Sequence, residues 1–229
     1  MKIQIISDIH GNFDALSALP QDYDELWVLG DLVNYGPQPA EVVDYVSQHA
    51  SLVVRGNHDH CIAYSEDPRC APRFRAMAEA TRGYTNSVLS DEQKDFLRRL
   101  PTQAEAEREH LKFQLLHAIP SDPLYGYAAG QSDRWPAELE GTDADVLLVG
   151  HTHIPFLRRV GSRMLCNPGS VGQAKSGKAS AYYAIWDNGK LRLKSVPYPV
   201  EQTVRKVEAL PIDEKIQQDL IKVLREGDL

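Results

Sequence analysis

The chain has 229 residues, of which 25 are basic and 32 are acidic, and its formal net charge is −7. A long polyanion is normally bound by a basic surface, so this balance argues against duplex nucleic acid as a partner. Hydrophobic residues make up 42% of the sequence, which is typical of a protein with a full core, and no run approaches the roughly 18 apolar residues of a membrane span. Three cysteines, an odd and sparse set, indicate reduced thiols and a cytoplasmic protein.

Short apolar runs that each end in a polar cluster dominate the first two thirds of the chain. These runs are too short for helices and predict buried strands over residues 3–6, 25–29, 52–54, 113–116 and 146–149. Helices are predicted over 13–19 and 39–48, between the first three strands. Strand–helix–strand alternation implies a parallel sheet, and sites in such sheets gather at the carboxyl ends of the strands. We therefore expect the polar clusters to meet at that edge.

The rest of the chain predicts a helical insertion followed by β-structure. The insertion covers about 61–101 and contains helices over 72–86 and 91–99, which either pack on the sheet or cap the site. Turn signals predict two hairpins, 156–160 with 163–166 and 182–186 with 190–196, as antiparallel strands of a second sheet. A last helix is predicted over 212–225. We interpret residues 1–229 as one domain with two sheets; the sequence gives no oligomeric state.

Seven metal-type side chains stand in the polar clusters, and they include no thiolate. They are Asp8, His10, Asp31, Asn57, His117, His151 and His153. Carboxylate, imidazole and amide donors suit Mn²⁺, Fe²⁺, Zn²⁺ or Ni²⁺, with Mn²⁺ favoured, and seven donors exceed the needs of one tetrahedral ion. Asp8 and His10 are two residues apart, as are His151 and His153, so each pair faces one side of an extended segment. The set predicts two metal ions that share a carboxylate, and Asp31 is the natural bridge.

The ordered motifs DxH at 8–10, GDxxxxG at 30–36, GNHD at 56–59, the lone His117 and GHTH at 150–153 resemble the calcineurin-like metallophosphoesterase superfamily. The turn at 167–172 resembles the one that follows GHTH in small bacterial phosphodiesterases of that group. The resemblance implies an α/β fold, a four-layer α/β/β/α sandwich of two mixed sheets flanked by helices. It also implies that a metal-bound hydroxide attacks the phosphorus of a small phosphate ester.

The resemblance further implies a role for each motif residue. Asp8, His10 and His153 would hold one metal, Asn57, His117 and His151 the other, and Asp31 would bridge them. His58 would protonate or stabilise the leaving oxygen, and Asp59 would orient His58.

Two positions depart from the GDxxDRG pattern of the protein Ser/Thr phosphatases in this superfamily. Asn34 replaces the carboxylate that would support the catalytic histidine, and Tyr35 replaces the arginine that would bind a dianionic phosphate. Both changes favour a singly charged diester over a phosphomonoester, and we assign both residues to substrate binding. Asn12 is a further candidate for a phosphate contact, with a turn role as its alternative.

The leading interpretation is a binuclear phosphodiesterase for small nucleotide-type diesters. The alternative is hydrolysis of dinucleoside polyphosphates, because symmetrical diadenosine tetraphosphatases share the implied fold. A repair-type nuclease and a non-catalytic binding scaffold are weaker alternatives. Tyr125 and Tyr127 could form an aromatic wall for a nucleobase. Lys175 and Lys178 are expected in a solvated loop, with contact to an extended polyphosphate as the alternative.

Overall fold

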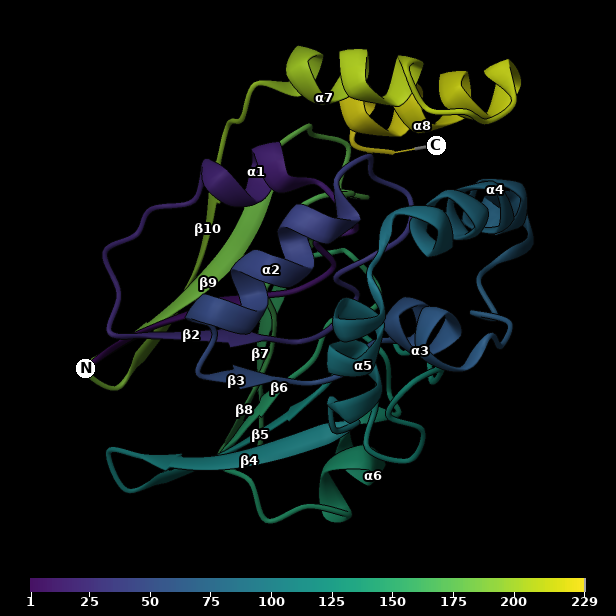
Figure 1. Ribbon diagram of the computed structural model, residues 1–229. Coiled ribbons are helices and arrows are strands. Elements are labelled where there is room, and N and C mark those ends of the chain that lie inside the picture. The colour runs from purple at the N-terminus through teal and green to yellow at the C-terminus, as the bar shows by residue number, and fades with distance from the viewer. Residues whose placement is uncertain (229) are drawn as a thin grey trace.

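The computed structural model, which describes residues 1–228, consists of two five-stranded sheets packed face to face (Figure 1). In the order in which the strands pair, the first sheet contains β10 (Lys190–Val196), β9 (Ala181–Asp187), β1 (Lys2–Ile6), β2 (Glu25–Val28) and β3 (Leu52–Val53). The second contains β4 (Gln103–Arg108), β5 (Leu111–Leu116), β6 (Val146–Leu148), β8 (Arg163–Asn167) and β7 (Phe156–Val160).

Both sheets combine parallel and antiparallel pairs. In the first sheet β1 to β3 run parallel, and β9 pairs antiparallel with β1. In the second sheet β5, β6 and β8 run parallel, while β4 and β7 pair antiparallel at the two edges. The prediction of two mixed sheets is confirmed.

The core between the sheets is built from the inward-facing residues of both. Trp27 of the first sheet meets Phe113 of the second edge to face, with ring centroids 5.2 Å apart, and Phe113 meets Trp186 at 5.0 Å. All three side chains are almost completely buried. Fully burying one large apolar side chain is worth about 1.5–3 kcal/mol, so this aromatic layer holds the sheets together.

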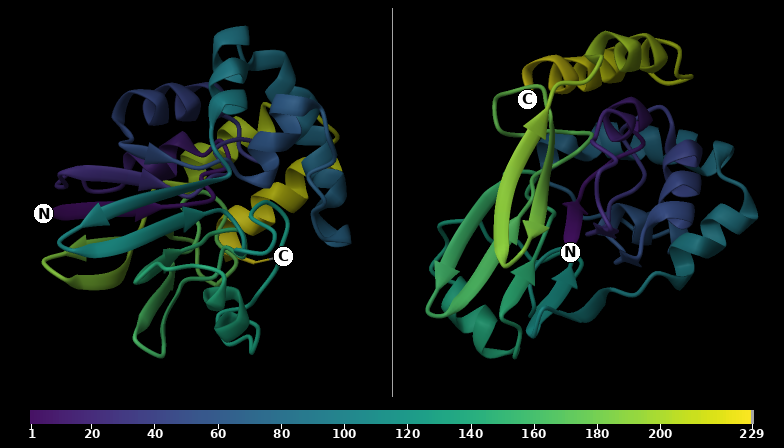
Figure 2. Two further views of the ribbon diagram at one scale, coloured as in Figure 1. Left: turned by 90° about the horizontal axis from the view of Figure 1, so that it is seen from below. Right: turned by 90° about the vertical axis from the view of Figure 1, so that its left-hand side faces the viewer.

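Helices cover the outer faces of both sheets and complete the four-layer sandwich that the sequence predicts (Figure 2). The first sheet is covered by α1 (Phe13–Ser17), α2 (Pro39–His49) and α5 (Asp91–Arg99), and the second by α6 (Trp135–Glu140). The predicted capping box opens α5, where the Ser90 hydroxyl accepts from the backbone N–H of Gln93 at 3.2 Å.

The remaining helices lie beside the carboxyl ends of the strands. They are α3 (Asn57–Tyr64), α4 (Pro72–Val88), α7 (Val200–Glu208) and α8 (Glu214–Glu226). A third apolar cluster joins α4, α7 and α8 to Tyr35. In the part of the chain that the structure covers, no helix combines the length and apolar character needed to cross a bilayer.

The assignment of the predicted strands to sheets was wrong in two respects. The two C-terminal hairpins do not form a sheet of their own: β7 and β8 join β5 and β6, whereas β9 and β10 join β1. The five N-terminal runs are likewise divided between the sheets. Four elements were not predicted: β4, whose half-exposed sequence alternates alanine with charged residues, and the short helices α3, α6 and α7.

Candidate metal centre

Seven metal-type side chains converge where the carboxyl ends of strands from both sheets meet. Asp8 and His10 follow β1, Asp31 follows β2, and Asn57 opens α3 after β3. The other three come from the second sheet: His117 follows β5, and His151 and His153 follow β6. Six of the seven residues are buried and His151 is partly buried. The centre therefore lies at the seam between the two sheets.

Five of these residues have left-handed backbone conformations, which non-glycine residues rarely adopt. The φ angles are 54° at Asp8, 48° at His10, 54° at Asp31, 66° at His151 and 61° at His153. The spacing of Asp8 and His10 predicted an extended segment. In the structure the two side chains converge through sharp turns instead. Such strain clusters at functional sites, and here the chain bends immediately after a strand to aim a side chain at the seam.

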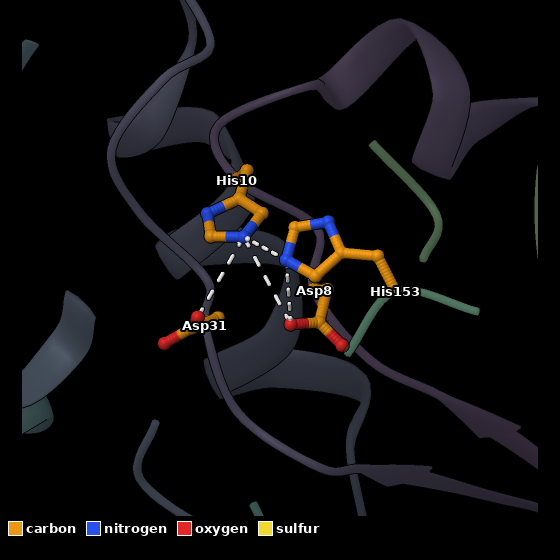
Figure 3. Close-up of side chains that lie close together, drawn as sticks. All are labelled: Asp8, His10, Asp31 and His153. Carbon is orange, nitrogen blue, oxygen red and sulfur yellow. Dashed lines mark hydrogen bonds and ion pairs between the residues drawn. The ribbon is translucent and has the colours of Figure 1, made fainter. Parts of the chain in front are cut away.

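The first group of donors surrounds a point between two histidines (Figure 3). Ligand atoms of Asp8, His10, Asp31 and His153 all lie within 4.8 Å of one another. The Nε2 atoms of His10 and His153 are 3.2 Å apart, His153 Nε2 is 3.3 Å from Asp8 Oδ1, and His10 Nε2 is 3.6 Å from Asp31 Oδ2.

The second group shares Asp31 with the first. Asp31, His117 and His151 form it, and His117 Nε2 lies 3.3 Å from Asp31 Oδ2. The Asn57 Oδ1 atom joins it at 2.9 Å from His117 Nε2 and 3.1 Å from His151 Nδ1. The amide nitrogen of Asn57 donates to the carbonyl of Pro68 at 2.7 Å, which turns its oxygen toward the histidines.

Backbone carbonyls fix three of the imidazole rings. In each ring Nδ1–H donates to a carbonyl, so that Nε2 carries the lone pair that faces the centre. The pairs are His10 with Val33 at 3.0 Å, His117 with Leu29 at 2.8 Å, and His153 with Gln173 at 2.6 Å.

The charge balance of the centre fits a bound divalent cation. Asp8 Oδ1 is buried without a hydrogen-bond partner among the described residues, and burial raises the pKa of Asp8 to about 7. Two imidazole lone pairs, those of His10 and His153, face each other at contact distance. Burial opposes charge on His117, yet Asp31 and Asp8 raise its pKa to about 9. A cation would neutralise the carboxylates and accept the lone pairs that face it.

A family model for the calcineurin-like phosphoesterase superfamily domain matches residues 1–190. The chain belongs to this superfamily. The match covers most of the chain and all seven donors, so the chain is a phosphoric ester hydrolase. The helical hairpin of α7 and α8 lies beyond the matched residues.

Three relatives and one solved structure are similar to this chain over most of their length. A symmetrical bis(5′-nucleosyl)-tetraphosphatase of Chromobacterium violaceum is 30% identical over 75% of this chain and 72% of its own. The phosphodiesterase YfcE of Escherichia coli is 28% identical over 83% of this chain and 90% of its own. An uncharacterized protein of Methanocaldococcus jannaschii is 30% identical over 90% of this chain and 91% of its own. A metallophosphoesterase structure from Sphaerobacter thermophilus superposes with a TM-score of 0.84 at 28% identity, over 99% of both chains.

His58 lies beside the centre, and Asn34 forms a hydrogen bond with its ring. The Asn34 amide donates to His58 Nδ1 at 2.9 Å, which places the imidazole proton on Nε2. Burial lowers the pKa of His58 to about 4, partly offset by Asp31. Asn34 is fully buried, and its amide contacts this histidine; the substrate contact assigned to Asn34 from the sequence stays a prediction.

Asp59 does not have the partner expected from the sequence. Its carboxylate accepts from three backbone N–H groups, those of Asp31 at 2.8 Å, Leu32 at 2.8 Å and Gly56 at 2.9 Å. These contacts tie the start of α3 to the loop that carries Asp31. Asp59 therefore positions the loop of the shared carboxylate, and both of its own carboxylate oxygens accept from the backbone.

Asn12 and Tyr35, the other two residues assigned to substrate binding, have the following surroundings. The Asn12 side chain caps α1 by accepting from Ala15 N at 3.1 Å, and its amide donates to Gly172 O at 3.0 Å, so it serves the turn alternative. Tyr35 lines the cavity, but its ring is almost buried between His10 and His58, at centroid distances of 4.9 and 4.8 Å. It forms a wall beside the histidines.

A cavity of about 520 Å³ opens over the metal centre. Its walls include Tyr125 and Tyr127, as the aromatic-wall alternative anticipated, and Lys175, which the sequence had placed in a solvated loop. Sequence reasoning missed the contribution of the segment before α4 and its first turn, notably Arg69 and Arg73. Their positions in the predicted helical insertion carried no signal of which side would face the centre.

Proposed function

We propose that the chain is a binuclear metal-dependent phosphoesterase that hydrolyses small phosphodiesters. The observation that carries the proposal is that Asp31 belongs to both groups of metal-type donors. Asp8, His10 and His153 would hold one ion, Asn57, His117 and His151 the other, and Asp31 would bridge them. Two divalent ions held by these residues, with Mn²⁺ favoured, would lower the pKa of water for attack and neutralise the phosphoryl oxygens.

Side chains beside the metal centre would position the groups that react. His58 would donate from Nε2 to the oxygen that leaves, since Asn34 fixes its proton on that nitrogen. Tyr35 holds the His58 ring in place by packing, and it brings no positive charge to the phosphate. The lack of an arginine at this position supports a singly charged diester over a doubly charged monoester.

A second candidate is hydrolysis of dinucleoside polyphosphates. The cavity of about 520 Å³ is larger than a single phosphodiester group requires, and the Chromobacterium violaceum relative bears the name of such an enzyme. We also propose that the enzyme works in the cytoplasm, as the sparse cysteines favour.

The test compares bis-p-nitrophenyl phosphate with p-nitrophenyl phosphate in the presence of Mn²⁺, with and without chelator. Faster, chelator-sensitive turnover of the diester is the expected result. Asp31→Asn should abolish it, while Asp22→Asn, an exposed residue paired with Lys2, provides the matched control. A preference for the monoester would refute the interpretation of Asn34 and Tyr35. Metal analysis that finds one ion per chain would refute the binuclear site.

A further inference from the structure

The wall of the cavity above the metal centre is basic, although the protein as a whole carries a net charge of −7. Arg69, Arg73 and Lys175 line it. Apart from the metal-site residue Asp31, Asp228 is the acidic side chain on this wall among residues 1–228. Three cations against one acid leave the wall positive, and a cavity lined by one sign of charge concentrates ligands of the opposite sign.

Two of these cations share a single aromatic ring. Lys175 Nζ lies 4.2 Å from the centroid of Phe74, and the guanidinium carbon of Arg73 lies 4.7 Å from it. Phe74 is buried in the first turn of α4 and packs in the cluster that α8 completes, so the ring is held firmly. The fold thus brings two like charges together, an arrangement that an anion between them would stabilise.

Arg69 completes the basic wall from the segment before α4. Its guanidinium carbon lies 4.3 Å from the ring centroid of Tyr125, which also lines the cavity. Stacking restricts the guanidinium plane but leaves its N–H groups free at the rim to bind oxygen atoms. Arg69 and Arg73 therefore frame the same opening, and Lys175 lies deeper in the wall.

The metal centre alone would supply enough positive charge to neutralise one phosphoryl group. Two divalent ions with Asp8 and Asp31 would already leave excess positive charge for a singly charged diester. Three more cations exceed what such a substrate can use. An additional phosphate group on the substrate would account for them.

We propose that Arg69, Arg73 and Lys175 form a second anion subsite, which holds a substrate phosphate group that is not cleaved. The proposal rests on the proposed phosphoesterase function. It narrows the substrate class to esters or anhydrides that carry at least one further phosphate beyond the scissile one.

The test measures how much one added phosphate improves binding. Dissociation constants of adenosine mono-, di- and triphosphate are determined by calorimetry on the Mn²⁺-loaded protein at a fixed free Mn²⁺ concentration. The adenosine moiety is common to all three, so its contacts cancel in the ratios. Wild-type protein should bind the diphosphate about ten-fold more tightly than the monophosphate, the gain expected of one charge-assisted contact. Arg73→Gln and Lys175→Gln should each remove most of that gain.

Matched controls come from the same elements. Arg75→Gln lies on α4 and Lys178→Gln lies on the loop of Lys175; both residues are exposed, and neither lines the cavity. Both controls should retain the full gain. A wild-type protein without preference for the diphosphate overturns the subsite, as does an equal loss in controls and test variants. Hydrolysis of bis-p-nitrophenyl phosphate, which has no second phosphate, is measured separately. Absence of Mn²⁺-dependent hydrolysis of both this diester and diadenosine tetraphosphate would refute the phosphoesterase proposal without bearing on these binding ratios.

Discussion

Replacing Asp59 by alanine is expected to destabilise the fold more than it alters any single catalytic step. The buried carboxylate accepts from the N–H groups of Asp31, Leu32 and Gly56. A buried donor without a partner costs about 1–3 kcal/mol, so three of them should cost about 3–9 kcal/mol. Domains have a free energy of unfolding of about 5–15 kcal/mol, so the variant should be close to unfolding at room temperature.

Urea unfolding of metal-free protein measures this loss without a contribution from metal binding. Asp24→Ala is the matched control, because its exposed carboxylate accepts a single backbone N–H, from Lys2 at 2.8 Å. That variant should lose no more than about 1 kcal/mol. If Asp59→Ala unfolds within about 1 kcal/mol of wild type while its turnover collapses, the positioning role is refuted. Asp59 would then act on His58, as its place in the motif suggested.

Three further predictions concern the centre and one ion pair. His58→Ala should retain its metals and lose most turnover, whereas Asp31→Ala should lose both metal and turnover. Metal analysis and a diester assay on each variant distinguish these outcomes. An Asp31→Ala variant that still holds its full complement of metal would contradict the bridging role. Chelator should lower the melting temperature, because buried carboxylates lose their countercharge; an unchanged melting curve would argue against metal at this site. Glu25→Gln should lower the free energy of unfolding by about 0.5–1 kcal/mol at neutral pH. The reason is that Arg108, whose Nε donates to Glu25 Oε1 at 2.7 Å, lowers the pKa of Glu25 below its usual value of 4.5. That contribution is present above the unfolded pKa and disappears as pH falls through the folded one, so wild type and variant should converge in acid; a difference that persists in acid would contradict it.

The central strands were predictable because strands buried on both faces are unbroken apolar runs, whereas the four-layer sandwich followed from the resemblance to the superfamily. Residues 26–29 and 146–149 are such runs, and polar donors follow each of them. This pattern does not indicate to which of the two sheets a strand belongs. An apolar strand such as β9 suits either sheet equally, and tertiary packing on β1 decides.

The metal-type donors were predictable because their chemistry is unusual in a core, whereas their neighbours were not. The carbonyl of Gln173 orients His153, but every residue has a carbonyl, so composition gives no signal. The roles of Asn12 and Asp59 depend on which backbone N–H groups lie within reach, and only the folded turns determine that. Arg73 lies in a helix whose exposed positions all look alike in the sequence.

The pairing of β1 with β9 limits when during synthesis the metal centre can form. The first strand of the chain stays without its second neighbour until residues 181–187 have left the ribosome. Every donor from Asp8 to His153 is translated before then, and so is Gln173, yet the seam between the sheets lacks one of its walls. Nascent chains and C-terminally shortened fragments therefore carry the full set of ligands without the frame that brings them together. We therefore expect metal loading to be a late event that follows completion of the whole fold, which contacts of such long sequence separation make slow.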